Sequence, residues 1–430
     1  MKENINIAVV GLGQIGIYLL NELNTKKKDI ESKTGKKINI VAISAKNINK
    51  KRKFKIDKKI FYNNPIEIFS KKDVDILFEV IGMPDGISKK IVETALRNKT
   101  HVITPNKALI SKHGDYLAKL AEKNNVNLEF EASVAGGIPI LRTIKEGLAT
   151  NKFSKVYGIL NGTSNYILSE MRNSKDNFSN VLKKAQKLGY AEPGNPKLDL
   201  NGLDAFAKVR ILSSLAFNTK ISKHKCLMEG IEKIELKDIE IANQLNLRIK
   251  LLGISEIINK KLFETVHPCL VSKNSFIGNV SGVMNAVILE GEPVGESILQ
   301  GEGAGPGPTS SSLLSDLLSI LRGEIKKPFG IPSSIRKPIK CYNVNNYKNS
   351  LYLRFEVKDR PGVLSKITNR LAKYKISIKR LIQTPDKKNN KATIVIITHK
   401  TNEFNAKKCL SIFKKDTDIH SYPTLIRIYN

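Results

Sequence analysis

Four residues with ionisable side chains lie close together in one stretch of the chain: Glu192, Asp199, Asp204 and Lys208. The segment between Glu192 and Gly202 is rich in proline, glycine and asparagine, which favours a loop. From Asp204 onward the apolar residues recur at helical spacing, which places Asp204 and Lys208 one turn apart on the same face. A loop that presents carboxylates beside an amine on a rigid helix suits the binding of an amino acid and the transfer of a proton.

The same aspartate and lysine also fit a simpler interpretation. An exposed pair at i, i+4 is common on solvated helices and contributes only about 0.3–0.5 kcal/mol. Against that interpretation, the neighbouring sequences NGTSN and GYAE contain glycines and small polar residues that an ordinary connector does not need. We therefore interpret the stretch as a functional site.

The N-terminal part of the chain predicts a place for a dinucleotide. A strand predicted over residues 5–10 is followed by the sequence GLGQIG and an amphipathic helix over about residues 15–26. Gly11 permits the tight turn, Gly13 lets the backbone approach a pyrophosphate, and Gly16 lets the helix pack close to the strand. The helix N-terminus supplies free N–H groups and partial positive charge for the phosphates.

The residues after the second predicted strand, 38–43, bear on the choice of cofactor. Folds that select NAD usually place Asp or Glu there, to bind the ribose hydroxyls. Here the residues are Ser44, Ala45 and Lys46, followed by Lys50, Lys51 and Arg52. The missing acid and the nearby cations favour the 2′-phosphate of NADP, while the general abundance of lysine leaves NAD open.

Strands and helices alternate over residues 1–130, which predicts a Rossmann-type, doubly wound parallel sheet. Ligands of such sheets lie at the carboxyl ends of the strands. Thr104 and Lys107 are at one of these ends. Lys107 therefore lies where a cation could meet the cofactor or a substrate carboxylate.

Residues 131–325 predict a second, α+β domain with an open mixed sheet able to pair subunits. Its first residues, 131–139, read as a hinge of small residues. Its strand-like segments are residues 234–242, 246–258, 262–271 and 285–291. A glycine-rich loop that begins at Gly301 opens a helix near 309–322, and is either an anion or cofactor contact or a crossover that returns to the first domain.

The rest of the chain predicts a linker, residues 326–349, and a small third domain, residues 350–430. The pattern of this domain is βαββαβ, a ferredoxin-like sandwich. Pro361 stands where the first turn of a helix tolerates proline, and Asp359 is able to cap that helix.

Composition sets limits on the function. A chain of 430 residues with 41% hydrophobic residues is expected to fold into two or three domains. The net charge of +32 raises the question of nucleic-acid binding. The basic residues are spread along the whole chain, however, and no zinc finger or RNA-recognition signature is present. Nucleic-acid binding is therefore a minor alternative, and we expect the charge to attract anionic cofactors and substrates.

Cysteine spacing and hydropathy point to the cytoplasm. The cysteines lie far apart without metal-ligand spacing, so we expect buried thiols in a reducing compartment: Cys226, Cys269, Cys341 and Cys409. The sequence enters a strand pattern at its start, which leaves no room for a signal peptide, and no apolar run reaches membrane-spanning length.

Five segments in order resemble the homoserine dehydrogenase family over residues 1 to about 325: GLGQIG, TPNKAL, EASVAGGIP, GILNGTSNYIL and GYAE followed by DLNGLDAFAK. The tail resembles an ACT domain, a small amino-acid-sensing module, with DRPGVL at its helix entry. The resemblance implies reversible NAD(P)-dependent interconversion of L-homoserine and L-aspartate 4-semialdehyde, in threonine, methionine and isoleucine biosynthesis. It also implies a homodimer or higher homo-oligomer, and feedback regulation through the tail.

The resemblance implies roles for particular residues. Lys208 would be the proton donor and Asp204 its orienting carboxylate. Substrate contacts would be Glu192, Asp199, Lys107, Thr163 and Tyr190. Cofactor contacts would be Gly11, Gly13, Gln14, Ile15, Gly16, Lys46, Thr104, Lys107 and Gly303. Backbone oxygens of a sodium site would come from Glu131, Val134, Gly136 and Ile138, and ligand binding to the tail would involve Asp359 and Gly362.

Three features depart from the family pattern. The loop from Glu192 to Asp204 has one additional residue, Pro193 or Gly194, which affects the alignment of Asp199. TPNK replaces the more frequent TANK, and NGTSN replaces NGTTN. Two alternatives also stay open: another NADP-dependent semialdehyde or amino-acid reductase of the same fold, and a sensor that binds dinucleotide and amino acid without catalysis.

Overall fold

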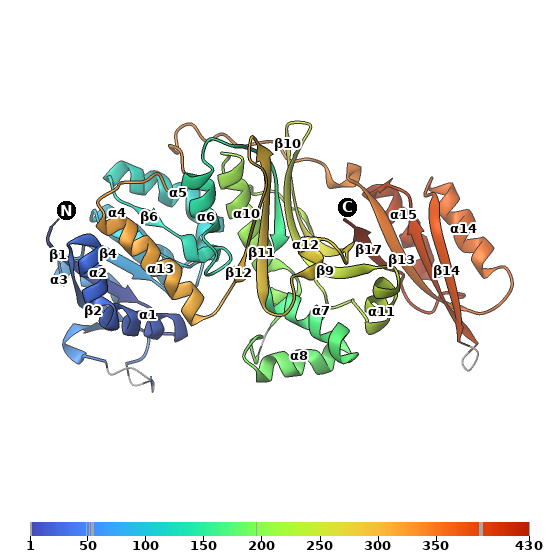
Figure 1. Cartoon of the computed structure of the whole chain (residues 1–430), viewed down its shortest axis with the longest axis horizontal. Coiled ribbons are helices and arrows are strands. Elements are labelled where there is room, and N and C mark those ends of the chain that lie inside the picture. The colour runs from blue at the N-terminus through green and yellow to red at the C-terminus, as the bar shows by residue number, and fades with distance from the viewer. Residues whose placement is uncertain are drawn as a thin grey trace.

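The computed structural model describes residues 2–48, 50, 52, 56–194, 196–386 and 390–429. Three bodies lie in a row along the long axis, with the N-terminal body at one end and the tail at the other (Figure 1). The predicted α/β class, with a parallel sheet, a mixed sheet and a βαββαβ tail, is confirmed.

The N-terminal body is built on a six-stranded parallel sheet in the order β3-β2-β1-β4-β5-β6. Its strands are β1 (Asn4–Val10), β2 (Lys37–Ser44), β3 (Phe61–Tyr62), β4 (Ile76–Glu79), β5 (His101–Ile103) and β6 (Leu128–Glu129). The helices are α1 (Gln14–Thr25), α2 (Lys27–Thr34), α3 (Ile68–Lys71), α4 (Ile87–Arg97) and α5 (Lys107–Asn124). The last strand of this sheet, β6, is only two residues long, because the chain turns into a 3-10 helix at Glu131–Ser133.

A helix from late in the chain completes this body. Helix α13 (Pro306–Leu321) packs against α1, and its Leu313 and Leu317 share a core with Leu19 and Leu20. Figure 1 shows it in orange among the blue and cyan elements. The chain therefore leaves the first body after β6, which ends at Glu129, and returns to it at Pro306, so that two connections join the first two bodies.

The second sheet is mixed and has eleven strands, with its long path in the order β12-β11-β7-β9-β10-β17-β13-β15-β14. The strands of the central body are β7 (Lys152–Ile159), β8 (Leu227–Met228), β9 (Leu247–Ile258), β10 (Lys261–Ser272), β11 (Met284–Glu292) and β12 (Gly295–Glu302). Its helices are α6 (Ile140–Arg142), α7 (Gly162–Ser174), α8 (Phe178–Lys187), α9 (Lys197–Leu200), α10 (Leu203–Ala216), α11 (Leu236–Gln244) and α12 (Phe276–Asn279).

The strand-like reading of residues 234–242 is wrong, because this segment forms helix α11. Glu235 and Asp238 form a capping box at its start, and Ile239 and Ala242 are buried three residues apart. A capping box fixes the first turn by satisfying two backbone N–H groups. The alternation of charged and apolar residues in this short segment concealed the helical period.

The tail is a four-stranded antiparallel sheet in the order β17-β13-β15-β14, the ferredoxin-like arrangement. Its elements are β13 (Lys348–Lys358), α14 (Val363–Lys373), β14 (Ile378–Asp386), β15 (Lys391–Thr398), β16 (Thr401–Asn402), α15 (Glu403–Ile412) and β17 (Thr424–Ile428). The expectation that Asp359 caps α14 is wrong: Gly362 is the N-cap, and no side chain caps the helix. Residues 387–389 of the turn expected before β15 lie outside the described residues.

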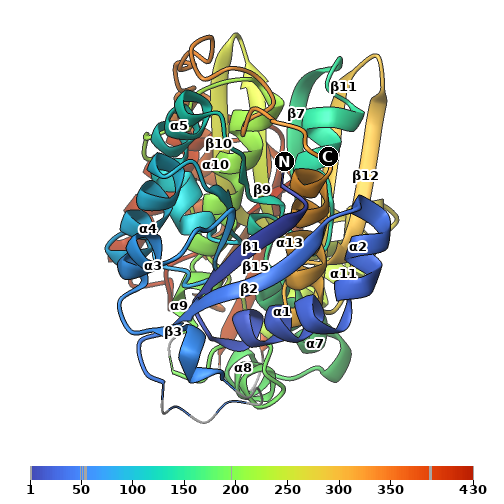
Figure 2. The ribbon, with the colours of Figure 1, turned by 90° about the vertical axis from the view of Figure 1, so that its left-hand side faces the viewer.

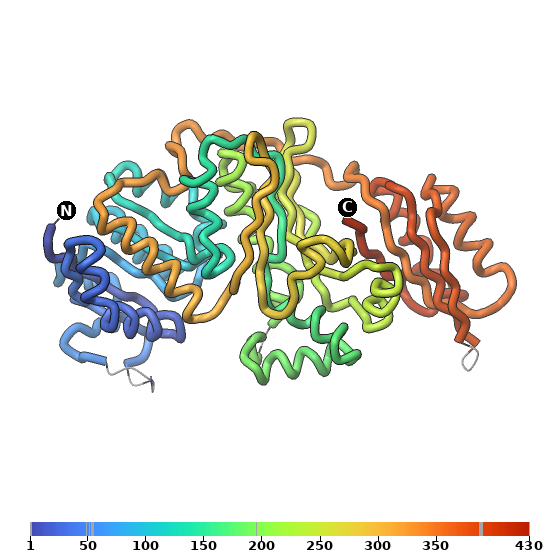
Figure 3. The backbone as a smooth tube through the Cα atoms, viewed as in Figure 1, coloured from blue at the N-terminus to red at the C-terminus, as the bar shows by residue number. Residues whose placement is uncertain are grey.

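The segment between α13 and β13 packs across the central body instead of hanging free (Figure 3). Arg336 is 2% exposed, pairs with Asp115 of α5 at 2.9 Å, and donates to Thr219 O at 2.7 Å. The Phe329 ring is buried beneath the Arg336 guanidinium. The segment expected as a linker thus contacts both Asp115 of α5 and Thr219, just after the end of α10.

Two global expectations concern cysteines and membranes. Cys269 and Cys409 are buried free thiols as expected, whereas Cys226 and Cys341 are only half-buried. Within the described ranges, none of the helices combines the length and the apolar character needed to cross a membrane.

Candidate active site

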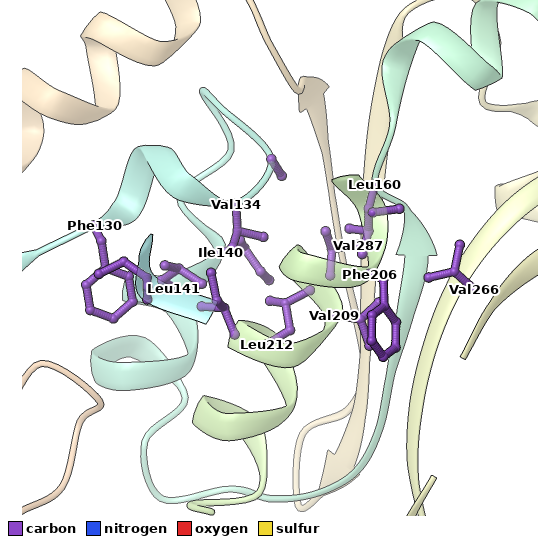
Figure 4. Packing of buried hydrophobic residues seen from close by; sticks show 14 of the residues in the cluster. Phe130, Val134, Ile140, Leu141, Leu160, Phe206, Val209, Leu212, Val266 and Val287 are labelled. Carbon is purple, nitrogen blue, oxygen red and sulfur yellow. The ribbon is translucent and has the colours of Figure 1, made fainter. Parts of the chain in front are cut away.

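Helix α10 carries the two predicted catalytic residues and lies between the first body and the mixed sheet (Figure 1). Seen from the side of the first body, it lies behind that body (Figure 2). Its apolar side chains Phe206, Val209 and Leu212 are buried. Figure 4 shows them between Val134, Ile140 and Leu141 on one side and Leu160, Val266 and Val287 on the other. Each such burial contributes on the order of 1.5–3 kcal/mol, which holds the helix and its polar residues in a fixed position.

The Asp204 carboxylate joins two ammonium groups. Its Oδ2 lies 2.8 Å from Lys208 Nζ, and its Oδ1 lies 2.9 Å from Lys107 Nζ. Lys208 and Asp204 are nearly buried, with side-chain exposures of 7% and 11%, while the Lys107 side chain is 39% exposed. The simpler interpretation of Asp204 and Lys208 as a solvated helix pair is therefore excluded.

Lys208 has a second neighbour that fixes its orientation. Its Nζ donates a hydrogen bond to Leu160 O at 2.6 Å, at the end of β7. An ammonium group has three donors, of which one goes to Leu160 and one to Asp204. The remaining N–H is available to a bound molecule.

Asn161 connects the aspartates. Its Nδ2 donates to Asp199 Oδ1 at 2.8 Å and to Asp204 Oδ2 at 3.0 Å. Its Oδ1 accepts the N–H of Ser164 at 2.8 Å, which makes it the N-cap of α7. A single amide thus starts α7 and holds two carboxylates together.

The two aspartates of the site have pKa values shifted in opposite directions. Burial alone would raise the pKa of the Asp204 carboxyl, but the Lys208 and Lys107 ammonium groups outweigh it and hold that pKa well below its usual range. Burial, and then the nearby Asp204 charge, raise the pKa of Asp199. The Asp204 charge, opposed by burial, raises the pKa of Lys107. At neutral pH the Asp204 carboxylate and the Lys107 ammonium are therefore both charged.

The other predicted substrate residues surround this centre. Thr163 Oγ1 donates to Tyr190 O at 2.6 Å and lies 3.5 Å from Asp199 Oδ2. The Tyr190 side chain is 43% exposed, with its ring 4.9 Å from that of Tyr166. Glu192 lies exposed on the loop, and its charge contributes to the raised pKa of Lys107. Thr163 thus links Tyr190 to Asp199, and Asn161 links Asp199 to Asp204.

The glycine-rich turn has the shape that a dinucleotide needs. Gly11 has φ +108°, and a Cβ there would lie 2.6 Å from the Val80 carbonyl carbon. A Cβ on Gly16 would lie 1.9 Å from Gly11 O, so these two glycines are required by the protein itself. Around Gly13, within the part of the chain that the structure describes, no atom lies within 4 Å of an added Cβ. Gln14 and Ile15 form the first turn of α1, which contains no acidic residue. The turn therefore fits a pyrophosphate.

This difference between the glycines gives a test. We expect Gly13→Val to weaken dinucleotide binding about tenfold or more, about 1.4 kcal/mol, by occupying the space of the pyrophosphate. The melting temperature should stay close to wild type, because an added Cβ at this position has open space around it in the described residues. Gly16→Ala, the matched control, should lower the melting temperature through its clash with Gly11 O. Fluorescence titration measures the affinity for the dinucleotide, and thermal unfolding measures the melting temperature. An unaltered dinucleotide affinity in Gly13→Val would contradict the assignment of this turn to the pyrophosphate.

At the end of β2, Lys46 is exposed, and Ser44 is buried. Arg52 folds back over the glycine-rich turn, where its Nε donates to Leu12 O at 3.3 Å and one Nη donates to Asn47 O at 2.6 Å. Lys51 lies outside the described residues. One cation, Arg52, thus contacts the glycine-rich turn, and Lys46 is exposed just after β2.

Thr104 does not point toward open space. It is fully buried, and its hydroxyl donates to Glu79 Oε2 at 2.6 Å. Glu79, at the end of β4, also accepts the N–H of Ile81 at 3.0 Å. Asn106 caps α5 and donates to Met83 O at 2.8 Å. This buried network fixes the loops after β4 and β5 and so places Lys107 at the first position of α5.

Gly303 forms the crossover from β12 to α13. A Cβ there would overlap the Asn285 amide, at 2.0 Å from Nδ2, and a Cβ on Gly136 would lie 2.6 Å from the Gly303 carbonyl carbon. The Asn285 amide is wholly buried, and neither of its polar atoms has a hydrogen-bond partner in the described residues. The Gly303 backbone therefore passes between the 131–139 segment and the mixed sheet.

The four carbonyls expected for a cation lie in one buried turn. Three of them accept hydrogen bonds within the protein: Glu131 O from Val134 N at 3.3 Å, Gly136 O from Ser312 Oγ at 2.7 Å, and Ile138 O from Ile140 N at 2.8 Å. Each carbonyl has two lone pairs, so these bonds leave a second position on each oxygen. The hinge is thus largely buried and internally hydrogen-bonded, with Gly136 at φ +53°.

Three residues were missed by sequence reasoning: Asn161, Ser164 and Glu79. The sequence did contain a signal for Asn161, because an Asn followed by Gly-Thr-Ser after a predicted strand is a typical helix N-cap. Ser164 donates to Asp199 O at 3.0 Å, which depends on a contact between distant segments. Glu79 reads as the end of an apolar strand, and its burial is visible only in three dimensions.

Comparison with known families covers each of the three bodies. The model for the NAD binding domain of homoserine dehydrogenase matches residues 11–131, the homoserine dehydrogenase model matches residues 139–318, and the ACT domain model matches residues 351–416.

Individual relatives match over the full chain. Homoserine dehydrogenase from Neisseria gonorrhoeae is 38% identical over 430 residues, covering 99% of this chain and 98% of the relative. The Bacillus subtilis enzyme is 35% identical, covering 93% and 92%. A crystal structure of a homoserine dehydrogenase from Thiobacillus denitrificans superposes with a TM-score of 0.90 at 33% identity, covering 99% of this chain and 98% of that one. Because these matches extend through the dinucleotide, catalytic and tail regions, this chain belongs to the homoserine dehydrogenase family.

Proposed function

We propose that this oxidoreductase interconverts L-homoserine and L-aspartate 4-semialdehyde with Lys208 as the proton donor. The observation that carries the proposal is the Lys208–Asp204–Lys107 bridge, in which Lys208 and Asp204 are nearly buried and Lys107 begins a helix of the body that contains the glycine-rich turn. Family membership gives the nicotinamide dinucleotide as cofactor. When bound, the cofactor supplies or accepts the hydride at the substrate carbon.

Lys208 acts on the substrate oxygen. In the reducing direction that oxygen becomes an alkoxide, and the Lys208 ammonium first stabilises its charge and then transfers a proton to it. Asp204 and Leu160 O hold two of the three N–H groups of Lys208, and we assign the third N–H to the substrate oxygen. In the oxidising direction the neutral amine accepts the proton of the alcohol.

The remaining residues hold the amino-acid end of the substrate. The Glu192 carboxylate is suited to bind the substrate ammonium through charge-assisted hydrogen bonds, with Asp199 behind it. Lys107 is suited to the substrate carboxylate. Since the Thr163 hydroxyl is bonded to Tyr190 O, we assign Thr163 and Tyr190 to shaping the loop beside Asp199.

We favour NADP over NAD. The residues after β2 include no acid, and Lys46 and Arg52 lie on the side where an adenosine 2′-phosphate would be held.

For sodium, the second lone pairs of the Glu131, Gly136 and Ile138 carbonyls, together with Val134 O, are suitable oxygen ligands. Such a cation would stiffen the buried hinge.

The activity is tested with a substrate panel. We expect purified protein to reduce NADP with L-homoserine at least about tenfold more efficiently than with other four-carbon amino alcohols or simple alcohols, because the ammonium and carboxylate contacts contribute to transition-state binding. The assay follows absorbance at 340 nm, the NADPH band. A comparable rate with an alcohol that lacks the α-amino group would favour the rival reductase. A protein that binds dinucleotide without turning over any of these compounds would favour the sensor.

We also propose that the edge strand β12 takes part in a homo-oligomer. Its only partner in the sheet of the described residues is β11, and Ile298 on it is 38% exposed. A free edge with exposed apolar side chains is a common site of subunit pairing. Light scattering after gel filtration gives the oligomeric state.

For the tail we propose regulation by a small amino acid, with L-threonine as the first candidate. Gly362 has φ +89°, is exposed at the start of α14, and no atom of the described residues lies within 4 Å of an added Cβ. Asp359 is half-buried beside it, with its N–H donated to Asn390 O at 3.1 Å. A free helix N-terminus favours a carboxylate ligand.

The regulatory proposal predicts the behaviour of Gly362→Asp. A carboxylate at this position repels an amino-acid carboxylate, so the half-inhibitory L-threonine concentration should rise about tenfold, with kcat changed less than about twofold. Gly35→Asp is the control, since Gly35 also has positive φ and open surroundings but lies at the end of α2. L-threonine inhibition curves are measured for wild type, Gly362→Asp and Gly35→Asp. Equal inhibition of wild type and Gly362→Asp would show that Gly362 is not part of the binding site.

A further inference from the structure

The last strand of the tail is joined to the catalytic sheet. Strand β17 pairs in parallel with β10, with Cys269 opposite Arg427 and Leu270 opposite Ile428. Tyr429 N also donates to Leu270 O at 2.9 Å. Figure 1 shows the C-terminus between the central body and the tail. Any shift of the tail sheet is therefore transmitted directly to β10.

Arg427 connects this strand to a second segment of the central body. It is 1% exposed, and its two Nη atoms donate to the Glu229 carboxylate at 2.7 and 3.1 Å. Its Nε donates to Glu403 of α15 at 3.1 Å. A bidentate, buried guanidinium fixes both the position and the direction of the carboxylate.

The residues beside Glu229 support the loop that contains Asp199. Glu229 N donates to Val266 O at 2.8 Å, and Ile231 N donates to Leu200 O at 2.9 Å. A Cβ on Gly230 would lie 1.9 Å from Leu200 O, so the two backbones are in direct contact. The segment 229–231 is therefore the floor on which the end of α9 lies.

This floor is next to the catalytic residues. Leu200 follows Asp199 directly, and Gly202 is the N-cap of α10, which carries Asp204. A Cβ on Gly202 would lie 3.0 Å from Val266 Cγ1 and 3.6 Å from Glu229 O. Residues 229–231 therefore contact the chain at Leu200 and at Gly202, between Asp199 and Asp204.

A second arginine of the tail holds the other end of the same segment. Arg354 of β13 is 3% exposed, and its Nε and Nη2 lie 2.6 and 3.1 Å from the two oxygens of Asp238. Asp238 in turn accepts the N–H of Glu235 at 3.0 Å, at the start of α11. The chain from Glu229 to Asp238 is thus clamped to the tail at both ends.

We infer that Glu229 and Arg427 are positioning residues for the substrate, through which the tail sets the place of Asp199. The inference rests on the proposed function and adds the route by which a tail ligand changes activity. Because the floor contacts the substrate loop and not the glycine-rich turn, the effect should fall on the substrate and spare the dinucleotide.

The test uses the full chain with two variants and two controls. Glu229→Gln keeps the hydrogen-bonding shape but removes the charge, and leaves Arg427 paired with Glu403. Gly230→Ala pushes against Leu200 O. Glu232→Gln, exposed in the same segment, and Gly147→Ala, with no atom within 4 Å of the added Cβ, are the matched controls. Steady-state kinetics with L-homoserine and NADP, and thermal unfolding of each protein, are the measurements.

We expect the KM for homoserine to rise about fivefold in Glu229→Gln and about tenfold or more in Gly230→Ala. The KM for NADP should change by less than about twofold, and the controls should match wild type. An unchanged homoserine KM in folded Glu229→Gln and Gly230→Ala, or an equal rise in both KM values, would overturn the inference. A wild-type protein that does not oxidise homoserine would instead overturn the proposed function.

Discussion

Lys208→Ala should reduce kcat for homoserine oxidation by about 10³-fold, because positioned proton transfer typically contributes 10²–10⁴-fold. The fold should persist, since Asp204 keeps its contacts with Lys107 and Asn161. The KM for NADP should stay near the wild-type value, because no contact of Lys208 involves the glycine-rich turn. Initial rates at saturating substrate measure the effect.

Two further variants separate proton transfer from charge. Lys208→Arg keeps a cation beside Asp204, but a guanidinium does not release its proton at ordinary pH, so the rate should remain low. Lys220→Ala, at an exposed lysine beyond the end of α10, should match wild type. If Lys208→Ala reduced NADP at the wild-type rate, the proposed proton donor would be wrong.

Local sequence predicted the parts of the site that depend on neighbours along the chain. The spacing of Asp204 and Lys208 on a helix, and the glycines between a strand and a helix, are such parts, and both are confirmed. Their information lies in helical period and backbone conformation, which a few adjacent residues determine.

Contacts between distant segments could not be predicted in this way. Lys107 reaches Asp204 from another body, and Arg427 reaches Glu229 from the end of the chain. Neither contact has a signature in spacing, because the sheet order decides which segments meet. Arg427 reads in the sequence as one more basic residue in a strand, although it is among the most buried side chains of the described residues.

Asp204→Asn should reduce kcat by about 10²-fold or more, since it removes the charge that holds two ammonium groups together. An amide at this position can still accept one hydrogen bond, but it leaves Lys208 and Lys107 to repel each other at close range. Asp29→Asn is the matched control: Asp29 and Lys33 form an i, i+4 pair at 2.8 Å on the surface of α2, with both side chains about half exposed. That pair contributes little, so its loss should leave the rate unchanged.

The pH dependence of Asp204→Asn follows from the charges around Asp204. The pKa of Lys107, raised by Asp204, should fall in the variant, and the pKa of Asp199, which burial and the same charge raise, should fall as well. In the wild type the pKa of Asp204 is lower in the folded than in the unfolded state, so its charge stabilises the fold above the unfolded value near pH 4, and this stabilisation is lost in acid. The melting temperature of Asp204→Asn should therefore lie below wild type at pH 7, and the difference should narrow as the pH falls below about 4. A constant difference across this range would mean that Asp204 is not held as a carboxylate by its two lysines.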